Sequence, residues 1–428
     1  MRMFSRWRRT ATAVAGAAAV ILALSGCTGG SSPQARTPQQ VSGDLPAETV
    51  DELQAAVEHA MAATGSSGAI VGVWVPWAGA WVTGLGTTSP DSDEAVTTDM
   101  AFRISNMTRP MTCDVLYGLA EDGVVGLDDP VSEHVASSPD LDDVTLRQLC
   151  DNTSGLAGSR DTTLPEALRT PEREWHPREV AAAGLGQDRT EAGVAFTDSD
   201  TGYLMLGTAL QNASTETAAA LFREYVTGPL GLRATTLPGR QAAEPGDPAL
   251  PGFFSDGADR NEGCVDPREY TELSASYGFT DSGAVSTIEE LGVYTEALAA
   301  RVKDGDKPSE RWSSPKPIST TSDSWYQYAG GTYIAGSMVG QQGSIPGYLT
   351  SAYSDTDNGL TVAVVLNNSA ASDAVVGYLA KELAAIVSKV PAREGETAPE
   401  FGLPWTAEDY HQRIADGAVC PLPEGDGE

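Results

Sequence analysis

Few residues of this chain have the types and the spacing that a reaction needs. A serine three positions before a lysine on a helix places a hydroxyl and an amine one turn apart, so that a neutral amine can take the serine proton. The only match is Ser313-Ser314-Pro315-Lys316, because no lysine precedes Lys303. Pro315 and its polar neighbours predict a loop, so we attribute this match to chance. No Gly-x-Ser-x-Gly nucleophile motif occurs.

Acidic side chains and histidines offer two further kinds of chemistry. Asp198 and Asp200 lie close enough in the chain to suggest a carboxylate pair for glycoside or peptide hydrolysis. A solvated acidic loop is the better interpretation, because the chain has 59 acidic residues. No metal site and no cofactor are expected, since no metal-ligand spacing joins the four histidines, His59, His134, His176 and His411.

The charge balance excludes whole classes of function. Acidic residues outnumber basic ones by 59 to 27, which gives a formal net charge of −32. Such a surface repels nucleic acid, so no nucleic-acid partner is expected. Hydrophobic residues are 41% of the 428 residues, which is enough for a substantial core and excludes general disorder.

The N-terminal residues have the pattern of a bacterial lipoprotein signal. Four arginines precede an apolar run over residues 11–24 that is too short to span a bilayer with ease. The run ends in Leu-Ser-Gly-Cys27, which favours lipid attachment to Cys27 over a plain secretory signal. We therefore predict a signal peptide over 1–26, a flexible tether over 27–46, and a lipid-anchored protein on the extracytoplasmic face of the cell membrane.

Hydrophobic periodicity predicts a two-lobed α/β (α+β) domain over residues 47–392. The expected elements are helices at 49–63, 106–121 and 373–389, a hairpin at 69–75 and 79–87, mostly helical structure from 145 to 229, and strands at 331–339, 348–353 and 360–366. Strands from both ends form one antiparallel sheet flanked by the terminal helices. The sheet lobe comprises 47–100 and 275–392, and the helical lobe is 101–274. The acidic, Pro-rich tail of 393–428 is expected to be an extended strap or to be partly disordered.

Several stretches resemble one protein family. They are Phe102-Arg103-Ile104, Gly126 to Val131, Thr145 to Leu149, Thr153 to Leu156, Gly228 to Leu232, Gly283 to Thr287 and Ile345 to Tyr348. In this order they are similar to the serine β-lactamase and D-Ala-D-Ala carboxypeptidase superfamily, in the branch that holds class C β-lactamases, the Streptomyces-type carboxypeptidase and related esterases. The resemblance covers about residues 45–390 and implies a β-lactamase/transpeptidase-like fold.

The resemblance also implies where a catalytic site should lie, and the chain departs from it there. Family members have the nucleophilic serine where Asn106 stands and the lysine where Arg109 stands. Their Tyr-x-Asn motif falls on Asp198 and Asp200. Asparagine has no nucleophilic hydroxyl, and arginine stays protonated to about pH 12, so it cannot serve as a general base.

The third family motif is reduced to its glycine. Gln341 falls on the histidine or lysine position, and Gly343 is kept. We expect Gly343, Ser344 and Tyr348 to line a ligand cleft together with Asp200. Asn106 and Gln341 are expected to line the same cleft.

Two expectations follow for the replaced residues. Arg109 and Asp198 carry opposite charges, so we predict an ion pair between them across the old active site. Ser105 is the one candidate for a rescued nucleophile, with Asp198 as its base. It lies one residue early, about 100° around the helix, and we interpret it as the helix N-cap, facing away from the cleft centre.

Export makes disulfides possible, and besides Cys27 the cysteines form an even set with three possible pairings. Buried free thiols are the alternative. In relatives, the helix that ends at Cys150 packs on the motif helix that carries Cys113, so the resemblance implies the pair Cys113–Cys150. Cys264–Cys420 is then the second pair, which would hold the tail.

Three functional hypotheses remain. The favoured one is a non-catalytic cell-envelope protein that binds a peptidoglycan-type or other small ligand, or a protein partner. The second is an active serine hydrolase (D-Ala-D-Ala carboxypeptidase, β-lactamase or esterase) that uses non-standard residues. The third is a structural lipoprotein without a ligand.

The predicted lipid anchor has a direct test. Cys27→Ser removes the sulfur that would carry the lipid, so the protein should move from the membrane fraction to the soluble fraction of the expressing cells. Membrane association of the Cys27→Ser protein that survives a high-salt wash would contradict the anchor.

Overall fold

The computed structural model describes residues 40–136, 141–241, 243–255, 264, 266–305 and 307–422. The predicted signal peptide, Cys27 and most of the predicted tether lie outside the described residues. Within the described ranges, no helix combines the length and the apolar character that crossing a membrane requires.

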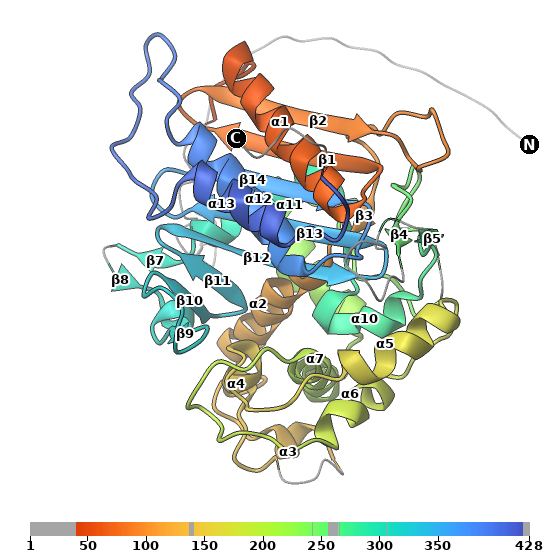
Figure 1. Ribbon diagram of the computed structural model, residues 1–428. Coiled ribbons are helices and arrows are strands. Elements are labelled where there is room, and N and C mark those ends of the chain that lie inside the picture. The colour runs from red at the N-terminus through yellow and green to blue at the C-terminus, as the bar shows by residue number, and fades with distance from the viewer. Residues whose placement is uncertain are drawn as a thin grey trace, which may run out of the picture. The chain divides into compact units, whose positions relative to one another are not determined.

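An eight-stranded antiparallel sheet forms the centre of the domain, in the order β2-β1-β14-β13-β12-β11-β10-β9 (Figure 1). Its strands are β1 (Gly68–Val75), β2 (Gly79–Gly86), β9 (Lys316–Pro317), β10 (Tyr326–Ala329), β11 (Thr332–Ala335), β12 (Met338–Ile345), β13 (Tyr348–Asp355) and β14 (Thr361–Leu366). The N-terminal hairpin pairs with the last strand, with Ile70 opposite Val365. This confirms the prediction that strands from both ends of the chain share one sheet.

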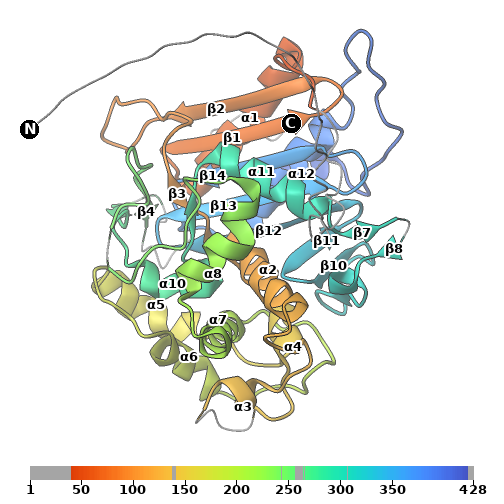
Figure 2. The same ribbon diagram turned by 180° about the vertical axis from the view of Figure 1, so that it is seen from behind.

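The alternation of side chains along the strands creates two hydrophobic cores. Val362 and Val364 of β14 belong to the core under α1 (Ala47–Thr64) and α12 (Asp373–Val387). Ala363 and Val365 face the other core, under α11 (Ile288–Ala299). Because side chains alternate with a period of two, one strand serves both cores. Figure 1 shows α1 and α12 in front of the sheet, and Figure 2, the view from behind, shows α11 on the opposite face.

The helical lobe is built around α7, which contacts α2, α4, α6 and α10. Its elements are α2 (Thr108–Glu121), α3 (Val131–His134), α4 (Leu146–Cys150), α5 (Arg160–Arg169), α6 (Pro177–Leu185), α7 (Asp200–Ser214), α8 (Ala218–Phe222), α9 (Gly228–Leu230) and α10 (Ala275–Ser282). α10, which begins at the predicted lobe boundary of residue 275, packs against α2, α6 and α7 of this lobe and also contacts β12. Three two-stranded ribbons complete the fold: β3 (Phe102–Arg103) with β6 (Val285–Ser286), β4 (Phe253–Phe254) with β5 (Arg268–Glu269), and β7 (Lys303–Asp304) with β8 (Lys307–Pro308).

The strand predicted at 331–339 is wrong in its bounds. The chain turns at Gly336, whose φ is +59°, so that β11 ends at Ala335 and β12 begins at Met338. β12 then continues to Ile345 through a Gly-Gln-Gln-Gly-Ser sequence that has little strand propensity. It is a strand because β11 and β13 pair with it on both sides, so tertiary context overrides local preference.

The tail is not an extended strap throughout. Residues 407–416 form α13 (Ala407–Asp416), which packs on α12. Thr406 caps its first turn by accepting a hydrogen bond from the Asp409 backbone, and Tyr410 and Ile414 are buried beneath it. Apolar residues at helical spacing are typical of a helix that packs on one face. The expectation for the tail rested on its acidic, Pro-rich composition and did not use this spacing.

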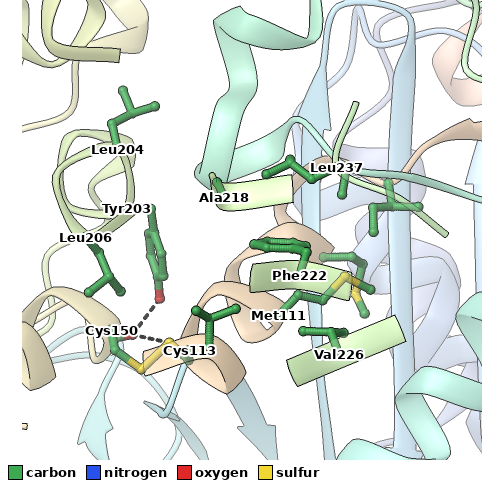
Figure 3. Close-up of a cluster of buried hydrophobic side chains, with 14 of the residues drawn as sticks. Met111, Cys113, Cys150, Tyr203, Leu204, Leu206, Ala218, Phe222, Val226 and Leu237 are labelled. Atoms are coloured by element: carbon green, nitrogen blue, oxygen red, sulfur yellow. Dashed lines mark hydrogen bonds between the residues drawn. A yellow bond between two sulfur atoms is a disulfide. The ribbon is translucent and has the colours of Figure 1, made fainter. Parts of the chain in front are cut away.

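Both predicted disulfides are confirmed. Cys113–Cys150 joins α2 to the end of α4, and Cys264–Cys420 ties the tail to the loop before β5. Figure 3 shows the first disulfide within the apolar interior of the helical lobe, where the Tyr203 hydroxyl donates a hydrogen bond of 2.5 Å to the Cys150 carbonyl.

Lys381 of α12 carries a buried amino group in the core beneath α13. Its side chain is 2% exposed, and Nζ donates to Gln342 Oε1 at 3.3 Å and lies 4.7 Å from the Tyr353 ring centre. Burial lowers the pKa of Lys381 to about 7. Between about pH 7 and pH 10.5 the unfolded chain therefore binds more protons at this residue than the folded chain. Stability is full above that window and is lost as the pH falls through it.

Replacement of Lys381 by methionine tests how much the burial of this charged side chain lowers the stability. Lys381→Met should raise the free energy of unfolding at pH 7 by about 1–3 kcal/mol, because Gln342 Oε1 keeps the Tyr353 hydroxyl as a donor. The gain should shrink as the pH approaches 10.5, as measured by urea unfolding across the pH range. Lys389→Met, at an exposed position of the same chain segment, is the matched control and should show no such trend. A loss of stability at pH 7 would show that the tyrosine rings and hydrogen bonds outweigh the desolvation cost.

Candidate functional site

A cleft of about 440 Å³ opens where the first turn of α2 meets the ends of α5, α10 and α12. Its lining comes from segments that are distant in the chain. The charged residues that line it are Arg109, Arg160, Asp161, Asp198, Asp200, Asp281 and Asp373. The fold therefore places a cleft where the family resemblance predicts one.

Asn106 stands at the base of this cleft on a 3₁₀ turn, Ser105–Met107, that precedes α2. Its side chain is 7% exposed, and its Nδ2 donates to Asp281 Oδ2 at 3.1 Å. A Cβ at Gly343 would lie 2.0 Å from Asn106 Oδ1, so only glycine admits Asn106 at this distance from β12. Gly343 is thus the back wall behind Asn106 rather than a contact for a ligand.

Arg109 lies one turn further along and is held by two carboxylates. Its Nη1 is 2.5 Å from Asp198 Oδ1, and its Nε is 2.8 Å from Asp281 Oδ1. The predicted ion pair with Asp198 is present, and Asp281 extends it to a triad. Burial alone lowers the pKa of Arg109, but Asp198 and Asp281 raise it by more, so that the pKa lies well above its usual value. The guanidinium is a permanent cation and has no proton-accepting role.

Asp281 is the buried carboxylate of the triad, whereas the Asp198 side chain is 54% exposed. Burial raises the pKa of Asp281 even though Arg109 acts in the opposite direction. Its two oxygens are taken by Arg109 Nε and Asn106 Nδ2. Asp281 therefore joins the two residues that stand at the family's serine and lysine positions.

The other two aspartates of the predicted site have separate partners. The Asp198 side chain is 54% exposed and also accepts a hydrogen bond from Asn152 Nδ2 at 3.3 Å. Asp200 begins α7 and accepts from the Ser159 backbone N–H at 2.7 Å and from the Ser159 hydroxyl. The two carboxylates are engaged in different contacts, which does not favour the acid–base pair considered from the sequence.

Three sequence-based expectations are wrong in detail. Gln341 does not line the cleft. It is fully buried because the β10–β11 turn covers it, and its Nε2 donates to Gly331 O of that turn at 2.9 Å. Tyr348 is also fully buried, with its hydroxyl donating to Leu250 O at 2.7 Å. Ser105 is not a side-chain N-cap, because no cap hydrogen bond forms and α2 begins at Thr108.

Ser105 nevertheless faces away from the cleft, as expected. It is fully buried, and its hydroxyl donates to the backbone carbonyl of Tyr348 at 3.4 Å. Its φ of +50° is unusual for serine and sets the sharp turn that presents Asn106. Ser344 does line the cleft, as predicted.

The side chains of the cleft limit its chemistry. Within the described part of the chain, its lining includes the serines Ser344, Ser369 and Ser372 but no lysine, histidine, tyrosine or cysteine. A serine nucleophile needs a neighbouring base, and the carboxylate nearest to Asn106 is already taken by two donors. The arrangement favours binding through charge over proton transfer.

Elsewhere among the described residues, Asp129, Glu133 and His134 place ligand atoms within 4.8 Å of one another. Asp129 and His134 are already paired at 3.1 Å, and Asp129 accepts from the Gly126 backbone as well. We assign no metal to this group.

Asp281, Arg160 and Asp373 were missed by the sequence analysis. Arg160 opens α5 and donates to Ser344 O at 2.6 Å, and Asp373 opens α12. Asp281 lies two residues before the family-like segment Gly283 to Thr287, which was a usable signal. No local pattern reveals that it meets Arg109, 172 residues away.

Comparisons with known proteins agree with this architecture. The beta-lactamase family profile matches residues 53–385. The chain is similar to the D-alanyl-D-alanine-carboxypeptidase/endopeptidase AmpH of Escherichia coli (strain K12), with 31% identity over 35% of this chain and 40% of the relative. It is also similar to a D-aminopeptidase of Cereibacter sphaeroides, with 24% identity over 64% of this chain and 52% of the relative. The chain thus spans about half or less of the length of these curated relatives.

Solved structures show the same fold. A D-amino acid amidase from Ochrobactrum anthropi SV3, complexed with L-phenylalanine amide, superposes with a TM-score of 0.64 at 19% identity, over 80% of this chain and 97% of that chain. A D-stereospecific amidohydrolase from Streptomyces sp. superposes with a TM-score of 0.62 at 21% identity, over 73% and 94% of the two chains. At these identities the likeness establishes the fold alone.

The triad predicts unequal effects for its members. Arg109→Met leaves Asp281 buried without its cation, so the free energy of unfolding should fall by about 3–5 kcal/mol. Asp198→Asn removes an exposed, screened partner and should cost less than about 1 kcal/mol. Urea unfolding at pH 7 measures both. Equal losses for the two variants would contradict the central position of Asp281.

Proposed function

The chain belongs to the beta-lactamase family, and from this we propose that it is a non-catalytic member whose cleft binds a ligand of the cell envelope. One observation carries the proposal. The position of the nucleophilic serine holds Asn106, and the position of the general base holds Arg109, locked between Asp198 and Asp281. The cleft is present, while these two positions carry neither the hydroxyl nor the amine that the family uses to form and break a covalent bond.

The charges of the cleft favour an amine-bearing ligand. Five aspartates and two arginines line it, and Arg109 is already neutralised by its own partners. Asp161 and Asp373 are not in a salt bridge with any described residue, and neither is Arg160, the second arginine of the lining. A molecule with a free ammonium group and one carboxylate matches this pattern.

Peptidoglycan stem peptides have this chemistry when they carry a diamino acid with a free amine. The names of the curated relatives refer to a D-alanyl-D-alanine-carboxypeptidase/endopeptidase and a D-aminopeptidase, which supports a ligand that contains D-amino acids. The lipoprotein pattern at Cys27 supports the same setting, because a lipid anchor on the extracytoplasmic face would hold the domain beside the cell wall.

The alternative of an active serine hydrolase rests on Ser105, and the geometry does not favour it. Ser105 is turned toward the Tyr348 carbonyl, and Asp198 is bound by Arg109 and Asn152. A structural lipoprotein without a ligand is the third hypothesis. A measurement of ligand binding distinguishes it from the proposed ligand-binding protein.

Two assays on the purified protein test the proposal. A fluorescent penicillin or a fluorophosphonate probe should leave no covalent label, because the serines among the described lining residues have no lysine, histidine or tyrosine beside them in the cleft to activate them. Stem peptides with a free amine should raise the melting temperature, since a ligand that binds only the folded state stabilises it. N-acetylation of that amine should remove most of the shift.

Matched variants locate the binding. Asp161→Asn removes one cleft carboxylate and should weaken the amine-bearing peptide by about tenfold. Asp142→Asn, an exposed position outside the cleft lining, should leave binding unchanged. Covalent labelling would establish the hydrolase instead, and the absence of any thermal shift would favour the structural lipoprotein.

A further inference from the structure

We propose that a second cavity, in the helical lobe, is a binding site for a small organic anion with an apolar body. This cavity has a volume of about 580 Å³ and lies among α6, α7, α8 and the start of α10. It shares no lining residue with the cleft at Arg109. Its size is in the range that small-molecule sites occupy. The inference is independent of the proposed function.

The charge of this cavity is opposite to that of the protein. Arg178 and Arg240 line it, and the described residues of its lining include neither aspartate nor glutamate, in a chain with a formal charge of −32. No carboxylate of the described residues lies within salt-bridge distance of either arginine. The nearest acidic residue in α6, Glu179, is paired with Arg173 instead. Two unneutralised guanidinium groups at one cavity match a carboxylate.

The hydrogen bonds of the two arginines leave donors available. Arg178 Nη2 donates to the Ala136 carbonyl at 2.9 Å, and Arg240 Nη2 donates to the Trp175 carbonyl at 2.8 Å. Each guanidinium has five N–H donors, so most remain for an anion. The first residues of α6, Pro177 and Arg178, also line the cavity, and the positive end of a helix dipole adds to the attraction.

The rest of the lining is apolar and suits the body of such a ligand. Ala218, Leu237 and Phe279 contribute hydrocarbon surface, and Figure 3 shows Ala218 and Leu237 near one another in the interior of this lobe. Trp175 also lines the cavity, with 4% of its surface exposed. Its indole Nε1–H has no hydrogen-bond partner among the described residues. A buried donor without a partner is unusual in a folded protein.

Phe279 adds a backbone observation. It sits within α10 with φ +39° and ψ −126°, a conformation that is costly for a bulky side chain. Strained residues of this kind persist where the surrounding structure requires them, often at ligand sites. Here the strain places an aromatic side chain in the cavity wall, two residues before Asp281 of the cleft.

Isothermal titration calorimetry of the purified protein tests the site. The probe is 1-naphthylacetate at 0.15 M ionic strength, compared with 1-naphthylacetamide, which has the same shape without the charge. The carboxylate should bind saturably, and the amide at least about tenfold more weakly, because hydrogen bonds to charged groups are the stronger ones. Arg178→Gln combined with Arg240→Gln should weaken the carboxylate by at least about tenfold.

Matched controls make the outcome decisive. Arg223→Gln, an exposed arginine outside the cavity lining, should bind the carboxylate like the unaltered protein. Asp161→Asn, in the other cleft, should do the same, so that failure here is distinguishable from failure of the proposed function. The proposal is overturned if the carboxylate shows no saturable binding, if the amide binds equally well, or if the Arg178→Gln, Arg240→Gln protein binds unchanged. Thermal unfolding of each variant confirms that it is folded.

Discussion

The guanidinium of Arg109 is a buried cation, and the local structure around the old active site depends on keeping it paired. Removing a charge from water costs several kcal/mol unless close partners compensate for the lost hydration. Asp281 supplies that compensation from α10 and Asp198 from the segment before α7, and Asp281 also binds Asn106. One cation thus joins the start of α2 to two other elements of the helical lobe. Replacing only Arg109 by the family's lysine, or only Asn106 by the family's serine, would break this set of contacts.

This constraint accounts for the side chains that meet in the cleft. Gly343 still gives β12 a surface without a side chain, but Asn106 occupies the space in front of it. Arg109 stands at the position of the family's proton acceptor, but its guanidinium stays protonated at physiological pH and cannot accept a proton. What remains is a concave, charged surface, and such surfaces bind ligands by complementary charge. Among the described residues, the lining of the second cavity contains two arginines and no acid, which is the charge pattern that suits an anion.

The two cavities are linked through one short helix. Ala275, Ser276 and Phe279 of α10 line the cavity that contains Arg178 and Arg240, while Asp281 at the end of α10 holds Arg109. The kink at Phe279 separates these two roles within eight residues. Any ligand that alters the kink would act on an element that also positions Asp281.

Much of the fold follows from local sequence patterns. Alternation in the β1–β2 hairpin and in β14, the helical spacing of α1 and α12, and the ordered family-like segments predict the antiparallel sheet, its flanking helices and the helical lobe. The replacement of serine and lysine by Asn106 and Arg109 is also visible in the sequence, as is the opposite charge of Asp198.

Other features depend on residues that are distant in the chain. β12 is a strand because its neighbours pair with it, Gln341 is covered by the β10–β11 turn, and Asp281 reaches Arg109 across 172 positions. The sequence determined which chemical groups the cleft contains, since those are residue types. Only the tertiary structure decided which of them meet, because burial and pairing arise between segments that no local pattern connects.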